Sequence, residues 1–141
     1  MATKDKSKDK TLMVSGKRKT SVAKARIVNG TGIITLNRIP HTLLNPFHRL
    51  AIEEPLRIAK KIVNEINYDI HIKIFGGGRE SQVEAARLAL ARALFAKTKS
   101  QKLKEAFNAY DKHLLVADVR RKEAYKPGDS KARAKRQTSY R

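Results

Sequence analysis

The sequence has no cysteine and no tryptophan, few acidic residues and no long apolar run. Without cysteine the chain can form no disulfide, no cysteine-ligated zinc site and no iron–sulfur cluster, and it has no thiol nucleophile. No apolar stretch approaches the roughly 18 residues that a membrane-spanning helix needs. The first ten residues lack the apolar core of a signal peptide, so we expect a cytoplasmic protein that is not exported.

The scarcity of acidic residues leaves a strongly basic chain. Lys and Arg total 32 against 13 Asp and Glu, which gives a formal net charge of +19 over 141 residues. Residues 1–26 and 120–141 each carry nine basic and two acidic residues, whereas the 93 residues between them carry only +5. A polyanion relieves such self-repulsion, and nucleic acid is the simplest candidate. We expect no membrane partner and no homo-oligomer.

Alternating apolar and polar residues predict strands in the first half of the chain. Thr11–Ser15 opens an apolar strand, which residues 16–20 interrupt with a glycine and three consecutive cations. In Val22–Val28, three apolar residues alternate with lysine and arginine, which is typical of a half-buried strand with a basic outer face. A turn at Asn29–Gly32 then predicts that Ile33–Leu36 returns beside this strand as a hairpin.

Helical periodicity and a third strand fill the middle of the chain. Asn45-Pro46 is typical of a helix start, and Pro55 is expected to kink this helix or to start a new one. Tyr68–Ile74 alternates as a strand. Ser81-Gln82-Val83-Glu84 reads as a capping box that opens a helix from Val83 to Phe95. A last helix is expected at Gln101–Tyr110, with Leu103, Phe107 and Tyr110 facing the core.

This order of elements predicts an α/β (α+β) domain in two layers, a mixed sheet with helices packed on it. Residues 11–119 are expected to form the globular domain, after a disordered basic leader at residues 1–10. Residues 120–141 are expected to form an extended basic tail.

Few residues suggest catalysis or metal binding. The four histidines have no metal-like spacing, and adjacent Glu53 and Glu54 would diverge on a helix. We therefore predict no enzyme, no catalytic residues, no metal and no cofactor. Gly76-Gly77-Gly78-Arg79 fits neither the Walker nor the dinucleotide-binding pattern. It could still form a simple turn, or bring backbone close to an RNA backbone.

Two basic segments are the best candidates for phosphate contacts. Lys17-Arg18-Lys19 lies between two apolar strand segments, and outward-facing Lys24 and Arg26 extend the same patch. In the tail, arginines and lysines alternate with alanines before a final Gln-Thr-Ser-Tyr-Arg. Such a segment cannot build a core, but an RNA groove could order it through phosphate pairs and the stacking of Tyr140.

Three ordered signatures resemble the family of universal small-subunit ribosomal protein nine, called protein sixteen in eukaryotes. The first is Val14–Arg26, and the second is Gly76–Gly78 with the helix that follows it. In the tail, Ala134-Lys135 and Thr138-Ser139-Tyr140 depart from the bacterial sequence and resemble archaeal and eukaryotic members, which suggests an archaeal-type protein. The second signature is matched by Gln82, Ala85, Arg87, Ala89, Ala91, Arg92, Ala93 and Leu94, and the third by Leu115, Asp118, Arg120, Glu123, Lys126, Gly128, Lys131, Ala132, Arg133, Gln137, Ser139 and Arg141.

The resemblance implies a fold like the second domain of ribosomal protein five, with a left-handed β-α-β crossover. It also implies that the protein binds small-subunit rRNA in the head, beside neighbouring head proteins, and reaches the peptidyl-site tRNA with its tail. The residues expected to contact rRNA are Lys17, Arg18, Lys19, Lys24, Arg26, Gly76, Gly77, Gly78, Arg79, Arg120, Arg121, Lys126, Lys131, Arg133, Lys135 and Arg136. Those expected to contact tRNA are Ser139, Tyr140 and Arg141.

Two alternatives stay open at this point. A general nucleic-acid-binding protein would bind duplex DNA as well as ribosomal RNA. The second alternative is a small nucleotide-dependent enzyme of related fold. It rests on fold analogy only, and specific ATP binding at Gly76–Gly78 would favour it.

Overall fold

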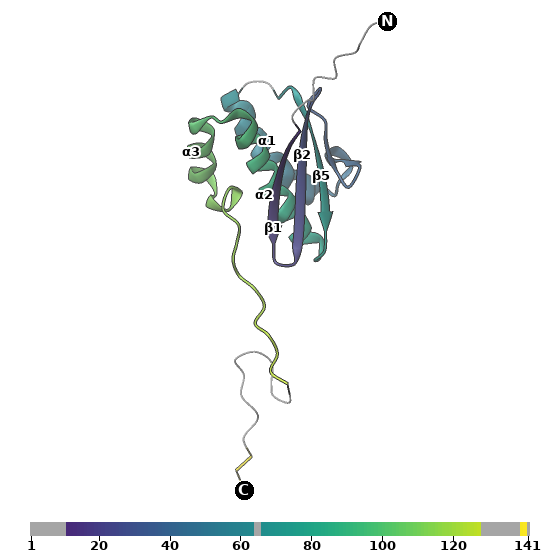
Figure 1. Ribbon diagram of the computed structural model, residues 1–141, viewed down its shortest axis with the longest axis vertical. Helices are drawn as coiled ribbons and strands as arrows, with labels where there is room; N and C mark the ends of the chain where they lie inside the picture. The colour runs from purple at the N-terminus through teal and green to yellow at the C-terminus, as the bar shows by residue number, and fades with distance from the viewer. Residues whose placement is uncertain (1–10, 64–65, 128–138, 141) are drawn as a thin grey trace, which may run out of the picture.

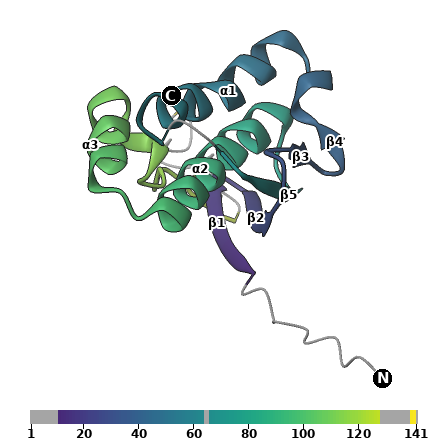
Figure 2. The same ribbon diagram turned by 90° about the horizontal axis from the view of Figure 1, so that it is seen from above.

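The computed structural model describes residues 11–63, 66–127 and 139–140. A five-stranded sheet has the order β1-β2-β5-β3-β4, and the helices cover one of its faces (Figures 1 and 2). This arrangement confirms the predicted mixed sheet with helices packed on it. The strands are β1 (Leu12–Arg18), β2 (Ser21–Asn29), β3 (Ile34–Leu36), β4 (Ile39–Pro40) and β5 (Tyr68–Phe75). The helices are α1 (Pro46–Val63), α2 (Arg79–Thr98) and α3 (Gln101–Tyr110), with short 3₁₀ turns η1 (His41–Leu43) and η2 (Lys112–Leu114).

The predicted hairpin between β2 and β3 is wrong. β5 lies between these strands, antiparallel to β2 and parallel to β3. The long β5 matches β2 residue for residue from Val22 to Asn29, whereas three-residue β3 offers β2 much less pairing. The carboxylate of Asp69, in β5, also accepts backbone N–H groups from the turn before β3, at 2.8–2.9 Å. The turn is thereby held against β5 rather than closing directly on β2.

A hairpin does form one strand earlier, between β1 and β2. The cations at residues 17 and 18 do not interrupt β1, because the strand continues to Arg18 and turns at Lys19-Thr20. Lys19 takes a left-handed backbone conformation there, with φ 51°. Three cations in the sequence therefore mark the end of a strand and its turn.

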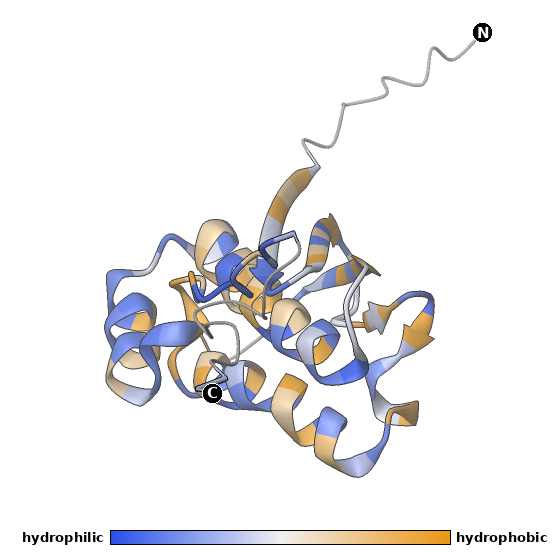
Figure 3. Cartoon of the chain, turned by 90° about the horizontal axis from the view of Figure 1, so that it is seen from below, coloured by the Kyte–Doolittle hydropathy of each residue, from blue (hydrophilic) through white to orange (hydrophobic). Residues whose placement is uncertain are grey.

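The sheet buries its inner face against α2. Ala23, Ala25 and Ile27 are buried as predicted, and Figure 3 shows the same alternation as blue and orange bands along the strands. Gly16 lets β1 approach the helix closely, because a Cβ there would lie 2.4 Å from the carbonyl oxygen of Ala85. Small residues on both elements therefore set the distance between the layers.

The helices agree with the sequence except at their ends. α1 runs continuously through the buried Pro55. α2 begins at Arg79, and Ser81 acts within its first turn, where its hydroxyl accepts the Gly78 N–H at 3.1 Å. α3 has the predicted bounds, but Tyr110 is 57% exposed because it ends the helix on the solvent side. No helix within the described residues is long and apolar enough to cross a membrane.

The parallel pair β3 and β5 is joined through α1, which gives the β-α-β unit that the family resemblance implies. That this crossover connection is left-handed stays a prediction. The leader at residues 1–10 lies outside the described residues, and so does most of the expected tail.

Candidate nucleic-acid interface

The face of the sheet opposite the helices is open and basic. Strand register places Lys24 of β2 beside Lys73 of β5, and Arg26 beside His71. All four side chains lie on the outer face, because their neighbours in sequence are buried on the inner face. Lys24 and Arg26 were expected here, and the structure brings them together with two residues that the sequence interpretation did not select.

These side chains line a shallow groove of about 660 Å³, hereafter the sheet-face groove. Arg38 enters it from the turn after β3, where its φ of 71° is left-handed. The Thr35 hydroxyl lies 2.8 Å from Nδ1 of His71 and so orients the ring. Among the described residues, the lining carries four lysines and arginines and no acid; it comprises Thr11, Met13, Lys24, Arg26, Thr35, Arg38, His71, Ile72 and Lys73.

Apolar surface accompanies these cations on the same face. Met13 is 64% exposed within the groove, and Phe75 is 59% exposed at the end of β5. Cations that pair with phosphates and an aromatic ring on which a base can stack are the two components of RNA-binding sheets. The open face can therefore contact both the backbone and the bases of a folded RNA.

A second basic groove, of about 580 Å³, forms where the β1–β2 turn meets the start of the tail. We call it the turn–tail groove. Lys19 and Thr20 come from the turn, while Arg121 and Lys122 come from a segment about a hundred residues later. Arg18 and Arg120 complete the lining. The predicted residues of the first and last signatures thus lie together, joined by Lys122, which had not been selected.

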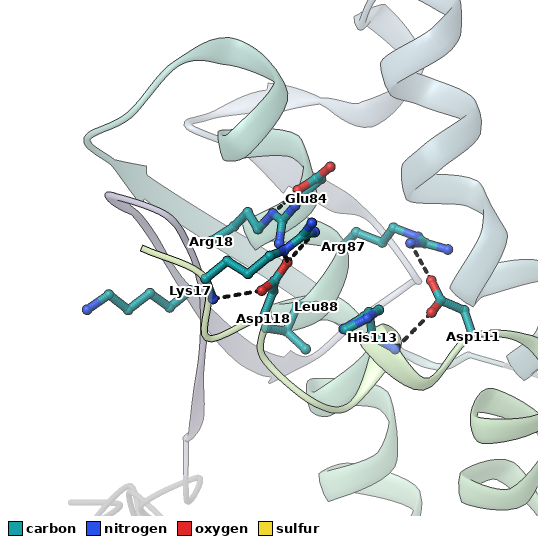
Figure 4. A pocket seen from close by; sticks show the side chains of 9 residues that line it. Lys17, Arg18, Glu84, Arg87, Leu88, Asp111, His113 and Asp118 are labelled. Atoms are coloured by element: carbon teal, nitrogen blue, oxygen red, sulfur yellow. Dashed lines mark hydrogen bonds and ion pairs between the residues drawn. The ribbon is translucent and has the colours of Figure 1, made fainter. Parts of the chain in front are cut away.

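Arg18 and Arg120 are engaged inside the protein as well. Figure 4 shows Arg18 reaching both Glu84 of α2 and Asp118, and Arg120 also pairs with Asp118, at 2.7 Å. The Arg18 side chain is only 18% exposed. Of the three cations at 17–19, Arg18 is therefore committed to the fold, whereas Lys17 and Lys19 face outward.

The glycine run has a structural explanation. Gly76 and Gly77 have φ of 71° and 69°, and a Cβ on Gly77 would lie 1.9 Å from the Ser21 hydroxyl oxygen. The carbonyl of Gly76 accepts hydrogen bonds from Ser21 at 3.0 Å and from Gln82 at 3.1 Å. The run is thus a tight turn locked onto the start of β2, with exposed Arg79 beginning α2.

The titratable side chains nearby form ion pairs with one another. In the described part of the chain, no group of three His, Asp or Glu could hold a metal ion. His48 pairs with Glu80 at 2.9 Å on the surface. Partial burial raises the pKa of Asp111, but hydrogen bonds from the His113 N–H and from Arg87 outweigh it and leave the pKa lowered. These carboxylates serve the fold.

Part of the predicted tail can be located. Lys126 is exposed, and Ser139 and Tyr140 are exposed near the C-terminus, with Tyr140 at 93%. The remaining tail residues of the prediction lie outside the described residues: Lys131, Arg133, Lys135, Arg136 and Arg141.

Comparison with known proteins decides the family. Residues 16–141 match the family described as ribosomal protein S9/S16. The chain belongs to the ribosomal protein S9/S16 family. Its relatives include the small ribosomal subunit protein uS9 of Methanococcus vannielii, 43% identical over 129 residues that cover 89% of this chain and 95% of the relative. The uS9 proteins of two Methanococcus maripaludis strains, C5 and C7, match to the same extent.

Membership of the S9/S16 family confirms the resemblance drawn from the three signatures, including its archaeal character. It also confirms that the protein is not an enzyme, since this is a family of ribosomal structural proteins. The nucleotide-dependent alternative is thereby set aside, in agreement with the structural use of the glycine turn.

Proposed function

We propose that this small-subunit ribosomal protein binds the rRNA of the subunit head through its open sheet face and turn–tail groove, and supports the peptidyl-site tRNA with its C-terminal tail. The names of its relatives support the assignment to the small subunit. The protein works without catalysis, by charge, hydrogen bonding and shape.

One observation carries the rRNA proposal. The helices cover one face of the sheet, and the other face presents cations from β2, β5 and the turn after β3. Within the described residues, neither this groove nor the turn–tail groove has an acidic side chain in its lining. Surfaces of this charge and flatness bind the backbone of folded RNA.

The tail proposal is supported by composition and by the direction of the chain. Residues 119–127 are exposed and run away from the helices as an extended segment (Figure 1). The last twelve residues carry five cations and no acid, and end in Tyr140 and Arg141. Arginine pairs with phosphate oxygens through a planar fork, and a tyrosine ring stacks on a base or a sugar. Such an end suits the anticodon region of a bound tRNA.

The rRNA proposal is tested by neutralising the open face. The triple variant Lys24→Gln/Arg26→Gln/Lys73→Gln should bind the head domain of the rRNA more weakly. Its log–log salt slope should be smaller by about 2 to 3, as expected when three phosphate contacts are lost. The matched control Lys60→Gln/Lys102→Gln/Lys104→Gln removes the same charge from exposed positions of α1 and α3, and should change little.

Equal losses in the two triple variants would contradict the sheet-face site. A chain that binds duplex DNA as tightly as the head rRNA would instead be a general nucleic-acid-binding protein. Both outcomes are read from the same titrations, with DNA as competitor.

A further inference from the structure

Three arginines of the globular domain hold the segment that leads from α3 into the tail. Arg87 of α2 donates to the Asp111 carboxylate at 3.0 Å. One turn and a half later, Arg92 donates to the carbonyl of Leu115 at 2.8 Å, and also to that of Ser15 in β1 at 2.9 Å. Arg18, at the end of β1, pairs with Asp118. The segment is thus fixed at successive points along its length.

Asp118 is the last of these points. Its side chain is only 9% exposed, and the residues from Val119 to Pro127 are all exposed. The exposed tail segment therefore begins directly after this nearly buried carboxylate. Beyond it, the chain leaves the domain (Figure 1).

The contacts of Asp118 join the globular domain, here called the body, to the tail. On the body side, Arg18 is shared between Asp118 and Glu84 of α2 (Figure 4). On the tail side, the Asp118 carboxylate accepts the backbone N–H of Arg120 at 2.8 Å and the Nε of the same residue at 2.8 Å. Both backbone and side chain of Arg120 are thereby oriented. Hydrogen bonds between charged groups in a partly buried site are stronger than those at the surface.

We propose that Asp118, held by Arg18, is a positioning residue that sets the direction in which the tail leaves the domain. That this direction brings the tail to the peptidyl-site tRNA rests on the function proposed above. The three partners, Arg18, Asp118 and Arg120, form a clamp that orients the tail, and two of them, Arg18 and Arg120, also line the turn–tail groove. Arginine suits position 18 because its planar guanidinium group pairs with the carboxylates of Glu84 and Asp118 at the same time. A lysine ammonium group would not fix the relative orientation of two carboxylates as well.

The clamp is separable from the core. The apolar side chains that anchor the same segment, such as Leu114 and Leu115, lie in or against the core cluster, and Asp118 contributes nothing to that cluster. Replacing Asp118 with Asn keeps the shape of the side chain and leaves Arg18 with Glu84 as a partner. This variant is therefore expected to fold and to lose chiefly the orientation of the tail.

The absence of cysteine makes a direct test practical, because two introduced cysteines are the only labelling sites. Spin labels at Lys60→Cys in α1 and Val119→Cys just after the clamp report the direction of the tail in the full chain; both positions are exposed. We expect one main distance. In Asp118→Asn the displaced component should increase about tenfold, as expected for loss of a hydrogen bond to a charged group.

Two further variants make the result specific. Arg18→Lys keeps the charge and should give an intermediate distribution, while Glu105→Gln in α3 removes the same charge as Asp118→Asn and should leave the distance unchanged. Thermal unfolding of each labelled chain checks the fold. An unchanged distance distribution in folded Asp118→Asn, or an equal change in Glu105→Gln, would overturn the clamp.

The role of the clamp is separated from the role of the tail in rebuilt small subunits. Subunits containing Asp118→Asn should release peptidyl-site tRNA faster, with unchanged incorporation of the protein. A changed distance distribution with unchanged tRNA release would leave the clamp standing and contradict the proposed function of the tail.

Discussion

At the scale of single residues, the close contact between β1 and α2 depends on the missing side chain of Gly16. A Cβ there would lie 2.4 Å from the Ala85 carbonyl oxygen and 2.6 Å from the Ala89 amide nitrogen. These are backbone atoms of a buried helix and cannot move aside cheaply. Gly16→Ala is therefore expected to lower the free energy of unfolding by about 1–3 kcal/mol, measured by urea denaturation.

Gly78→Ala is the matched control for this prediction. An added Cβ at Gly78 meets nothing within 4 Å, and its backbone φ of −95° suits any residue. The cost should stay within the loss of a glycine N-cap, about 1 kcal/mol or less. Similar losses in the two variants would show that the spacing of β1 and α2 does not depend on Gly16.

The residue scale also shows where sequence interpretation succeeds. Lys24 and Arg26 were correctly placed on the outer face, because alternation along one strand is a local property. Arg18 was predicted to contact phosphate, which stays a prediction; the structure adds that its side chain pairs with Glu84 and Asp118. No local pattern identifies those partners, which are far away in the sequence. A charged run shows where cations are, but only the fold shows which of them have carboxylate partners.

At the scale of elements, strand pairing was the part that the sequence could not supply. The ends of β2, β5 and α3 were predicted within one or two residues from periodicity. The strand that pairs with β2 was not predicted correctly. A turn at residues 29–32 is compatible with a β2–β3 hairpin, and it is equally compatible with the observed sheet, in which β5 lies between β2 and β3. For the same reason Lys73 and His71 were missed: their place beside Lys24 and Arg26 depends on that pairing.

Asp69 is the contact that holds the turn to β5, and its titration gives a prediction at this scale. Backbone hydrogen bonds from Ile33, Thr31 and Gly32 keep the pKa of Asp69 below its ordinary value of 3.8. Its contribution to stability is therefore complete above pH 3.8 and is lost as the pH falls through the lowered pKa.

The measurement compares the wild-type chain with Asp69→Asn by urea denaturation, from about pH 7 downward. The wild type should be the more stable at neutral pH, and the difference in unfolding midpoint should shrink below pH 3.8. A difference that stays constant through this range would mean that the charge of Asp69 does not hold the turn.

At the scale of the whole molecule, a domain with one covered and one open sheet face leads into an exposed basic segment at residues 119–127. The helices supply the core on one side, so the cations of the other side are left for a partner. The arginines of α2 and β1 meanwhile fix the start of the tail. The two parts of the proposed function, holding rRNA and reaching tRNA, thus belong to different parts of the chain and can be separated by experiment.

The most direct test of the account is tRNA release from the peptidyl site of small subunits rebuilt with the full chain or with one ending at Gln137. The shorter chain lacks Thr138, Ser139, Tyr140 and Arg141 and keeps every residue proposed to contact rRNA. We predict equal incorporation of the two chains and faster tRNA release from subunits with the shorter one. Equal release at equal incorporation would contradict the tail function and leave a protein that only scaffolds rRNA.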